Sequence, residues 1–330
     1  MDEHDHLDIE IPLSGFKDIA DMADDIVAKI RAGATKAEIA KILADSGLTD
    51  EQRKDAIMLA QAGSIISLED LNKAKAEAAD LLSKTDPEIE ATIKAMSMQE
   101  KLSLYLALAY CDSSKNSRVD ELKLAVVSSL PDKYNFYGND GKIIQNLPDR
   151  LYDELTHDPG FKDFYDQFAA KKSDPAYMKD LTVMVATTVA SVLGLSSVPT
   201  VSISSTAKYG DSQMAHKDGT IYIDPNYLRT GMKNSTFSSV VSLISHEMIH
   251  AYQADQVNTV IGGYPTTVPI NVENTDLNDP QTLNAMIYAI NKASYVNSGA
   301  LYYVQPVESQ AYKIQNKLRN DLNKWSLGQQ

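Results

Sequence analysis

The sequence predicts a mostly helical protein with a small β-sheet, an α+β fold organised as two domains. Helical periodicity with capping signals runs through most of the first 130 residues. Two short runs rich in β-branched and aromatic residues, VPTVSIS and GTIYID, appear in the second half before helical periodicity returns from about Thr236. The chain has 330 residues, of which 43% are hydrophobic, so it is long enough to bury more than one core.

Residues 1–16 are predicted to form an acidic N-terminal arm. Residues 1–25 hold nine acidic side chains against one lysine, and a run of this kind is usually solvated. His4 and His6 lie in this arm, where we expect an incidental pair, because two ligands on a chain terminus make a weak metal site. The start lacks the basic and apolar regions of a signal or transit peptide. We therefore expect a cytoplasmic protein, or one exported without a cleaved signal.

Residues 17–130 are predicted to form a helical bundle. Gly33, Gly47 and Gly63 break the helical pattern. The helix starts carry capping signals, which are Thr35 with Glu38, Thr49 with Gln52, a looser version at Ser67 with Asp70, and Asp86 followed by Pro87. The long segment that continues to Tyr110 has enough Ile, Met and Leu at helical spacing for a core-facing stripe.

Residues 131–148 are the predicted linker, because PDKYNFYGNDGKIIQNLP is rich in Pro, Gly, Asn and aromatic residues. The second domain then spans 149–330, with helical stretches at about 150–170 and 177–193 before the two strands. Segment 181–207 has no charged residue, so a transmembrane span is an alternative there. We expect no membrane span but a buried helix and a strand, because Gly194 is a natural helix stop and Pro199 would break a span.

Charge and cysteine content exclude other classes of site. The formal net charge of −14 argues against a nucleic-acid partner, because binding to phosphates needs clustered Lys and Arg. The single cysteine, Cys111, excludes an intrachain disulfide and leaves little scope for thiolate metal ligation. We expect Cys111 to be a structural, buried thiol at a helix end.

The segment 245–253, SHEMIHAYQ, contains the pattern H-E-x-x-H at His246, Glu247 and His250. Helix positions four apart share one face, so two imidazoles can reach one metal ion. Glu247 is rotated by about 100° from His246, close enough to contact a water on that ion without binding the ion. The same helix separates an apolar stripe from a polar line, which indicates a cleft; the line is Ser239, Ser242, His246, His250 and Gln253.

A catalytic zinc site takes three protein ligands and keeps one position open, so a third ligand must lie elsewhere. After Glu154 the chain contains only Glu247, Glu273 and Glu308 as glutamates. Glu273 lies in a polar loop, whereas Glu308 follows Pro306, which can open a helix. A helical carboxylate has the rigidity of a ligand, so Glu308 is favoured. The alternatives that stay open are Glu273, Asp276 and Asp279.

The motifs SHEMIHAYQ and, 58 residues after His250, PVESQAY resemble those of the gluzincin branch of zinc peptidases. The resemblance covers these two short motifs in the last third of the chain. It implies a zincin-like metallopeptidase domain over 149–330 with endopeptidase activity, that is, a hydrolase with Zn²⁺ as cofactor. The implied roles are zinc ligand for His246, His250 and Glu308 and general base for Glu247.

Two features set this sequence apart from related patterns. Many gluzincins have an Asp four residues after the ligand glutamate, bonded to a motif histidine, whereas this chain has Tyr312. The partner of the imidazoles is therefore not assigned by the resemblance. Metzincins have Gly and His at the places taken here by Gln253 and Gln256, so that family is excluded.

In the expected mechanism, zinc activates a water molecule and Glu247 takes its proton as a polarised peptide carbonyl is attacked. The developing oxyanion needs a Tyr or His beside the metal. The candidates are His216, Tyr222, Tyr302 and Tyr303, of which His216 and Tyr303 are the first to test. GTIYID could serve as an edge strand that binds extended substrate, or it could be plain core. The loop VNTVIGGYPTTVP could be a lid or a passive connection.

The leading hypothesis is thus a zinc endopeptidase that acts on a peptide or protein substrate, with the helical half as a module that docks a substrate or protein partner. One alternative is a binding or structural protein that keeps a zincin-like core without cleaving anything. Another is a toxin peptidase delivered into a second cell, since HEMIHAY also resembles segments of some bacterial effector proteases.

Overall fold

The computed structural model describes residues 16–50, 52–53, 56–57, 60, 68–109, 111, 116, 118–130, 135–138, 140–206, 213–261, 278–293, 295 and 300–329. Its internal contacts divide the chain into two compact units. Unit 1 combines Met1–Lys133 with Val257–Pro306, and unit 2 combines Tyr134–Gln256 with Val307–Gln330. Several predicted features lie outside the described residues, namely His4, His6, Gly63, Ser67, Glu273, Asp276 and most of the proposed lid loop.

The two units differ from the two predicted domains in where residues 257–306 belong. The first junction lies inside the predicted linker 131–148, but residues 257–306 join unit 1, although the sequence analysis placed them in the second domain. The physical reason lies in helix α13 (Pro280–Ala293), where six consecutive residues, 285–290, are fully buried. A helix that is apolar on all sides needs a core around it, and α13 packs against a helix from the first half of the chain, α6 (Met98–Ala109).

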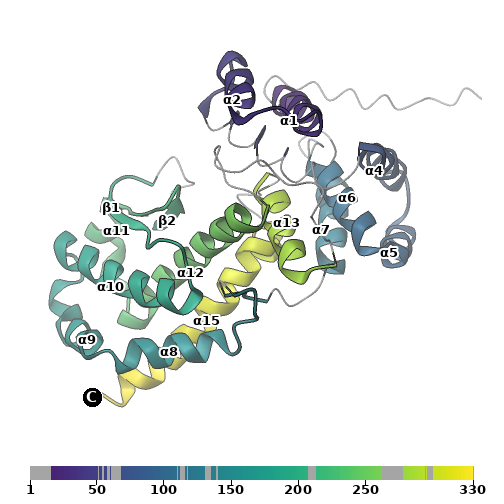
Figure 1. Cartoon of the computed structure of the whole chain (residues 1–330). Helices are drawn as coiled ribbons and strands as arrows, with labels where there is room; N and C mark the ends of the chain where they lie inside the picture. Colours follow the sequence, from purple (N-terminus) through teal and green to yellow (C-terminus); the bar gives the residue numbers. More distant parts are fainter. Residues whose placement is uncertain are drawn as a thin grey trace, which may run out of the picture. The chain divides into compact units, whose positions relative to one another are not determined.

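The protein is mostly helical with one small sheet, as the sequence predicts (Figure 1). The described elements of unit 1 are all helical. Besides α6 and α13, they are α1 (Phe16–Arg31), α2 (Lys36–Asp45), α4 (Leu68–Leu81), α5 (Asp86–Ala95), α7 (Arg118–Ser129), the π-helical turn η3 (Val257–Ile261) and α14 (Ala300–Val304).

Predicted capping chemistry starts two of these helical segments. Before α2, the Glu38 amide donates to Thr35 Oγ1 at 3.3 Å and the Thr35 amide donates to Glu38 Oε2 at 2.7 Å. Thr49 and Gln52 form the same reciprocal pair. Each pair satisfies two backbone donors that the first turn of a helix would otherwise leave open.

The segment from Asp86 towards Tyr110 is two helices rather than one long one. Helix α5 ends at Ala95 and α6 begins at Met98. Ser97 and Glu100 form a further capping box, in which the Glu100 amide donates to Ser97 Oγ and the Ser97 amide donates to Glu100 Oε2. Such a pair favours the start of a new helix, so the segment with the predicted apolar stripe is divided between α5 and α6. The leucines of α6 are nevertheless buried as expected, namely Leu102, Leu104, Leu106 and Leu108.

Cys111 lies just after α6, at a helix end as predicted, but it is half-buried rather than fully buried. Its Sγ donates to the Ala107 carbonyl at 3.6 Å. Burial raises the pKa of the Cys111 thiol, so the unreactive protonated form is favoured.

Unit 2 contains the sheet and the helices around it. Its elements are α8 (Leu147–His157), α9 (Pro159–Lys171), α10 (Pro175–Leu193), β1 (Thr200–Ile203), β2 (Met214–Lys217), β3 (Thr220–Ile223), α11 (Pro225–Arg229), the 3₁₀ helix η2 (Gly231–Asn234), α12 (Phe237–Gln256) and α15 (Pro306–Leu327). The predicted helix at 150–170 is divided into α8 and α9. Asp158 caps the new helix by accepting from the Gly160 amide, and Pro159 occupies its first turn.

The three strands have the order β1-β3-β2, with β1 parallel and β2 antiparallel to β3. GTIYID is therefore the central strand, so of the two alternatives left open for it the sheet order excludes the substrate-binding edge and fits plain core packing. The strand at the edge beside α12 is β2, which the sequence analysis did not predict. It joins β3 through Asp218 and Gly219, whose φ angles of 48° and 73° are typical of a tight hairpin turn.

Helix α10 is the apolar segment that raised the membrane alternative. By length and composition it could cross a membrane, and half of the relevant window is buried inside the protein. It packs against α8, α12 and β1 within unit 2. The helix ends at Gly194, whose φ of 68° is left-handed, and β1 follows. These contacts are those of a core helix followed by a strand, as the sequence analysis expected.

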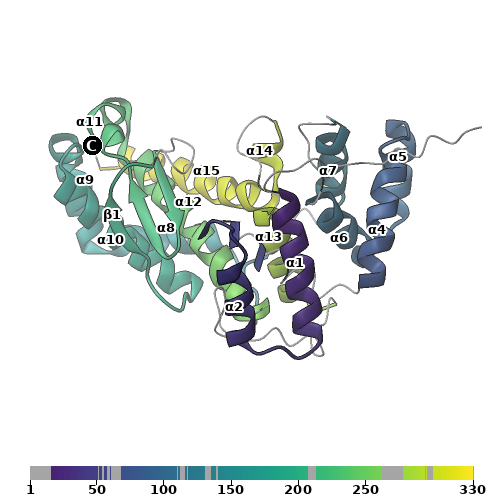
Figure 2. The same cartoon turned by 90° about the horizontal axis from the view of Figure 1, so that it is seen from above.

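Helices α12 and α15 lie side by side in both views (Figures 1 and 2). Ser238 of α12 donates to Asn323 of α15, and Phe161, Phe237 and Trp325 form an aromatic cluster with ring centroids 5.0 and 5.3 Å apart. At the other end of α12, Tyr252 is 1% exposed and its hydroxyl accepts from the Tyr137 amide at 2.7 Å. Helix α12 is thus fixed along its whole length.

Tyr252→Phe is expected to lower the free energy of unfolding of unit 2 by about 1–3 kcal/mol, because the buried Tyr137 amide loses its acceptor. Urea denaturation followed by the fluorescence of Trp325, the one tryptophan, measures this change. Tyr227→Phe is the matched control, since the partner that the described residues give that hydroxyl is another rotatable hydroxyl, that of Ser235. A loss no larger than in the control would contradict the assigned role of Tyr252.

Candidate metal centre

Helix α12 carries the H-E-x-x-H motif through the interior of unit 2. Most of its 20 residues are buried, and His246 and Glu247 are only 4% and 6% exposed. The apolar side chains of the helix fill the core, while the polar line predicted from the sequence is also largely buried. Buried polar groups need partners in the protein, so the contacts of His246, Glu247, His250 and Gln253 define the site.

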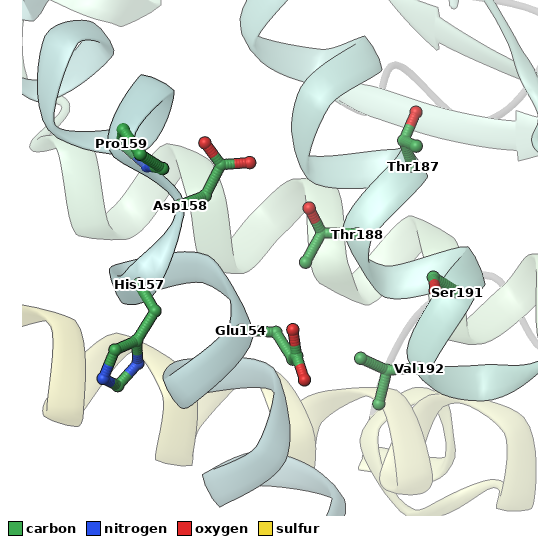
Figure 3. A pocket seen from close by; sticks show the side chains of 8 residues that line it. All are labelled: Glu154, His157, Asp158, Pro159, Thr187, Thr188, Ser191 and Val192. Atoms are coloured by element: carbon green, nitrogen blue, oxygen red, sulfur yellow. The ribbon is translucent and has the colours of Figure 1, made fainter.

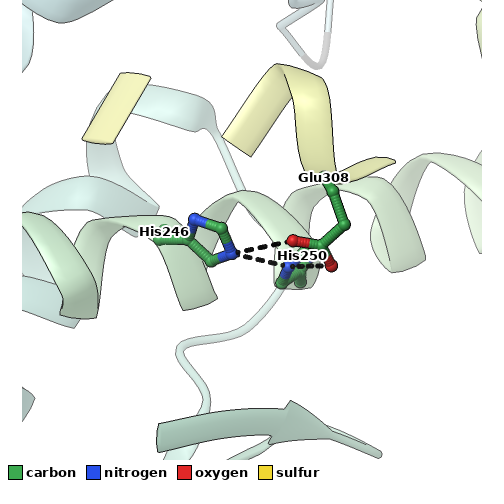
Figure 4. A group of neighbouring side chains, drawn as sticks. All are labelled: His246, His250 and Glu308. Carbon is green, nitrogen blue, oxygen red and sulfur yellow. Dashed lines mark hydrogen bonds and ion pairs between the residues drawn. The ribbon is translucent and has the colours of Figure 1, made fainter. Parts of the chain in front are cut away.

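Three side chains converge at one point (Figure 4). His246 Nε2 lies 3.3 Å from Glu308 Oε2, and His250 Nε2 lies 3.2 Å from Glu308 Oε1. The two Nε2 atoms are 3.0 Å apart. Helical spacing places both imidazoles on one face of α12, and the first turn of α15 brings Glu308 to them, 2% exposed.

The structure thus brings together the three residues that the sequence analysis selected as metal ligands. Their ligand atoms all lie within 4.8 Å of one another, and they are the one group of this kind among the described residues. Of the alternative third ligands, Asp279 accepts from the amide and hydroxyl of Thr282 at the start of α13, in unit 1. Glu273 and Asp276 lie outside the described residues. A buried His-His-Glu group could hold a metal ion.

Without a bound cation, Glu308 and the two histidines affect one another's protonation. Burial opposes ionisation of Glu308, but its contacts with His246 and His250 outweigh burial and hold the pKa of this carboxyl well below its usual range. Burial also opposes protonation of His250, but the adjacent Glu308 carboxylate outweighs it and raises the pKa of that imidazole. The carboxylate therefore stays negative, as a ligand for a cation must.

Glu247 lies beside this group without belonging to it. Its Oε2 accepts a hydrogen bond from the His216 amide of β2 at 2.7 Å. Burial raises the pKa of the Glu247 carboxyl, although the neighbouring histidines partly oppose this effect. A buried carboxyl with a raised pKa, held by a backbone donor, thus lies next to the three convergent ligand-type side chains.

The predicted oxyanion candidates fall into two groups. The backbone amide of His216 contacts Glu247. The His216 side chain lies on the same sheet face as the buried Ile221, which is opposite His216 on β3. Tyr222 lies on the opposite face. Tyr302 and Tyr303 belong to unit 1, and Tyr303 is 61% exposed. A role in oxyanion stabilisation stays a prediction for all four.

Sequence reasoning placed Gln253 on the polar line of the helix and noted Tyr312, but it did not identify either residue as a partner of the imidazoles. Gln253 Oε1 lies 2.9 Å from His250 Nδ1, and Gln253 Nε2 donates both to the Val307 carbonyl and to Gln310 Oε1, each at 2.9 Å. Gln253 could have been found, since it lies one turn after His250 on the same face. Tyr312, at the place of the expected Asp, packs edge-on against His246 with ring centroids 4.7 Å apart.

Unit 2 also has an open pocket of about 450 Å³ among α8, α9 and α10 (Figure 3). Glu154, His157, Thr187 and Thr188 are among the residues that line it. Neither His246, His250 nor Glu308 lines it. Glu154, His157 and Asp158 do, but among the described residues their ligand atoms do not form a close group like that of His246, His250 and Glu308. The candidate metal ligands of unit 2 are therefore on α12 and α15, away from this pocket.

Comparisons of the chain with protein-family models, with curated proteins and with solved structures found no match.

Proposed function

We propose that this protein is a zinc-dependent peptidase that hydrolyses peptide bonds with Glu247 as the general base. The observation that carries the proposal is the convergence of His246, His250 and Glu308 on one point, with the buried carboxyl of Glu247 beside this group but outside it. The motif resemblance supports the same function.

The donor set fits zinc. A tetrahedral site with metal–nitrogen bonds of about 2.0–2.1 Å places neighbouring donor atoms roughly 3.3–3.4 Å apart. Here the two Nε2 atoms are 3.0 Å apart, and those of His250 and His246 lie 3.2 and 3.3 Å from one oxygen each of the Glu308 carboxylate. Two imidazoles and one carboxylate are also the ligand types found in catalytic zinc sites, and three protein ligands leave one position open. The side chains are therefore arranged to receive the ion with little movement.

Zinc held by these ligands would supply an activated water molecule and a Lewis acid that polarises the scissile carbonyl. Glu247 would take the proton of the attacking water and pass it to the leaving amine. The His216 amide orients this carboxylate through Oε2, which leaves Oε1 available for the proton. Because burial raises its pKa, Glu247 holds a proton more readily than an exposed glutamate would.

The edge of β2 supports a peptide as the substrate. The His216 amide points away from β3 and donates to Glu247. This outer edge of β2 therefore faces α12. An extended peptide can add to a sheet edge by pairing with backbone groups of the strand. Because the His216 amide already donates to Glu247, a peptide would pair with other backbone groups at this edge of β2. A peptide bound along β2 would lie beside Glu247. His216 and Tyr303 remain our candidates for the group that stabilises the oxyanion.

A proteome-wide cleavage screen tests the proposal. Cell lysate is treated with the wild-type protein or with Glu247→Gln, each loaded with one zinc per chain, and new peptide termini are identified. We expect termini that appear only with the wild-type protein. Identical sets of termini from both proteins would refute the peptidase function and favour the alternative of a metal-binding protein that cleaves nothing.

A further inference from the structure

We propose that Gln253 is a positioning residue of the metal site. It would hold His250 in the tautomer that presents Nε2 to the cation, and it would tie this imidazole to the helix that carries Glu308. The inference rests on the metal binding proposed above, but not on peptidase activity.

The contact between His250 and Gln253 follows from helix geometry. Residues three apart on α12 are neighbours on its surface, and Gln253 Oε1 lies 2.9 Å from His250 Nδ1. Gln253 is completely buried, so water does not compete for this contact. The imidazole is therefore held from the side opposite to Nε2, the atom that lies 3.2 Å from Glu308.

The orientation of the Gln253 amide is determined by its other neighbours. The Val307 carbonyl, 2.9 Å away, can only accept hydrogen bonds, so the amide atom that faces it must be the nitrogen. The amide oxygen then faces His250. Because an amide oxygen also only accepts, the proton of the neutral imidazole must be on Nδ1. Nε2 is left with the lone pair that a metal ion requires.

The same amide connects two ligands that come from different helices. Its nitrogen bonds Val307 and Gln310, which lie on either side of Glu308 on α15. Gln310 is only 3% exposed, so this network is buried on both helices. A buried network of this kind holds its members rigidly when every group is satisfied. Gln253 would thus fix the imidazole of His250 and the α15 backbone beside Glu308.

The other imidazole is held differently. Among the described residues, His246 Nδ1 has no hydrogen-bond partner, and the ring packs edge-on against Tyr312. Packing restrains the ring plane but does not select a tautomer. Apart from the contacts with Glu308 and between the two rings, Gln253 is the one polar partner of the imidazoles that the described residues provide, so its removal is a sharp test.

Gln253→Met keeps the volume of the side chain and removes both its donor and its acceptor. We expect zinc affinity to fall by about 10- to 100-fold, the usual effect of removing a group that orients a metal-bound histidine. Competition with a chromophoric chelator measures the affinity. NMR of ¹⁵N-histidine-labelled, zinc-loaded protein gives a second readout, since we expect the signal of an Nδ1-protonated, Nε2-bound His250 in the wild type and its loss or shift in the variant.

Two further variants separate positioning from packing. Gln256→Met makes the same substitution in another buried glutamine, 5% exposed and one turn further along α12, and we expect wild-type zinc affinity. In Gln253→Glu the carboxylate still accepts from His250 Nδ1, so we expect it to recover at least part of the lost affinity. Thermal unfolding, followed by Trp325 fluorescence, verifies that every variant is folded before zinc is added.

The outcomes are distinct. Unchanged zinc affinity and an unchanged His250 signal in Gln253→Met would overturn the inference while leaving the proposed metal site intact. Equal losses in Gln253→Met and Gln253→Glu, or a matching loss in Gln256→Met, would assign Gln253 to packing between α12 and α15 and also overturn it. A wild-type protein that binds no zinc would overturn the proposed function itself.

Discussion

Glu247→Gln is expected to lower kcat/KM for peptide cleavage by about 100- to 10,000-fold, the contribution of a positioned general base. The amide has the shape of the carboxylate and can still accept from the His216 amide, so the fold should be retained. It cannot take up a proton, so the attack of water loses its base. The rate is measured on a purified peptide whose cleavage site was identified with the wild-type protein.

The zinc content of Glu247→Gln shows whether a loss of activity is due to the missing base or to a lost metal ion. Because Glu247 is outside the group formed by His246, His250 and Glu308, the variant should bind one zinc with near wild-type affinity. Glu154→Gln is the matched control, since it makes the same change in unit 2 at a residue that lines the pocket beside α8. Activity of Glu247→Gln equal to that of the control would show that Glu247 is not the base.

The residues of the site that were predictable from sequence are those that helix geometry fixes. His246 and His250 share a face because they are four residues apart, and Glu247 is turned away for the same reason. Glu308 was reached by counting the available glutamates and by recognising that Pro306 opens a helix. The structure places its carboxylate 3.2 and 3.3 Å from the two imidazoles.

What could not be predicted depends on contacts between distant segments. Strand β2 has the sequence MAHK, which lacks the β-branched pattern of a strand, and it forms because β3 supplies its ladder. Whether GTIYID lies at the centre or at an edge is a matter of sheet order, which the pattern of one strand does not contain. The hydrogen bond from the His216 amide to Glu247 follows from that order.

The partner of His250 illustrates the same limit at a single residue. Gln253 stands at the right helical spacing, but its amide is oriented by the Val307 carbonyl, 54 residues later in the chain. Only the packing of α15 on α12 brings them together. The composition of α13 likewise predicts that this helix is buried, but not against which segments. The contacts group residues 257–306 with the first part of the chain, whereas the sequence analysis grouped them with the last.

Glu308→Ala is expected to weaken zinc binding by at least about 100-fold. Removing a residue that only orients a ligand costs roughly 10- to 100-fold in affinity, and removing a ligand itself must cost more. The loss should be large because no exposed carboxylate can replace one held at 2% exposure between two imidazoles. Competition with a chelator measures the affinity, and Glu273→Ala and Asp279→Ala are the controls that test the alternative third ligands.

The stability of unit 2 gives an independent readout of the same prediction. A ligand present at 100 times its Kd stabilises the folded state by about 2.7 kcal/mol, and a site weakened 100-fold would gain only about 0.4 kcal/mol at that concentration. Denaturation followed by Trp325 fluorescence should therefore show zinc-dependent stabilisation in the wild type and almost none in Glu308→Ala. If instead Glu273→Ala or Asp279→Ala loses this stabilisation and Glu308→Ala keeps it, then the third ligand comes from the segment before α13 and the carboxylate on α15 serves only to pair the two imidazoles.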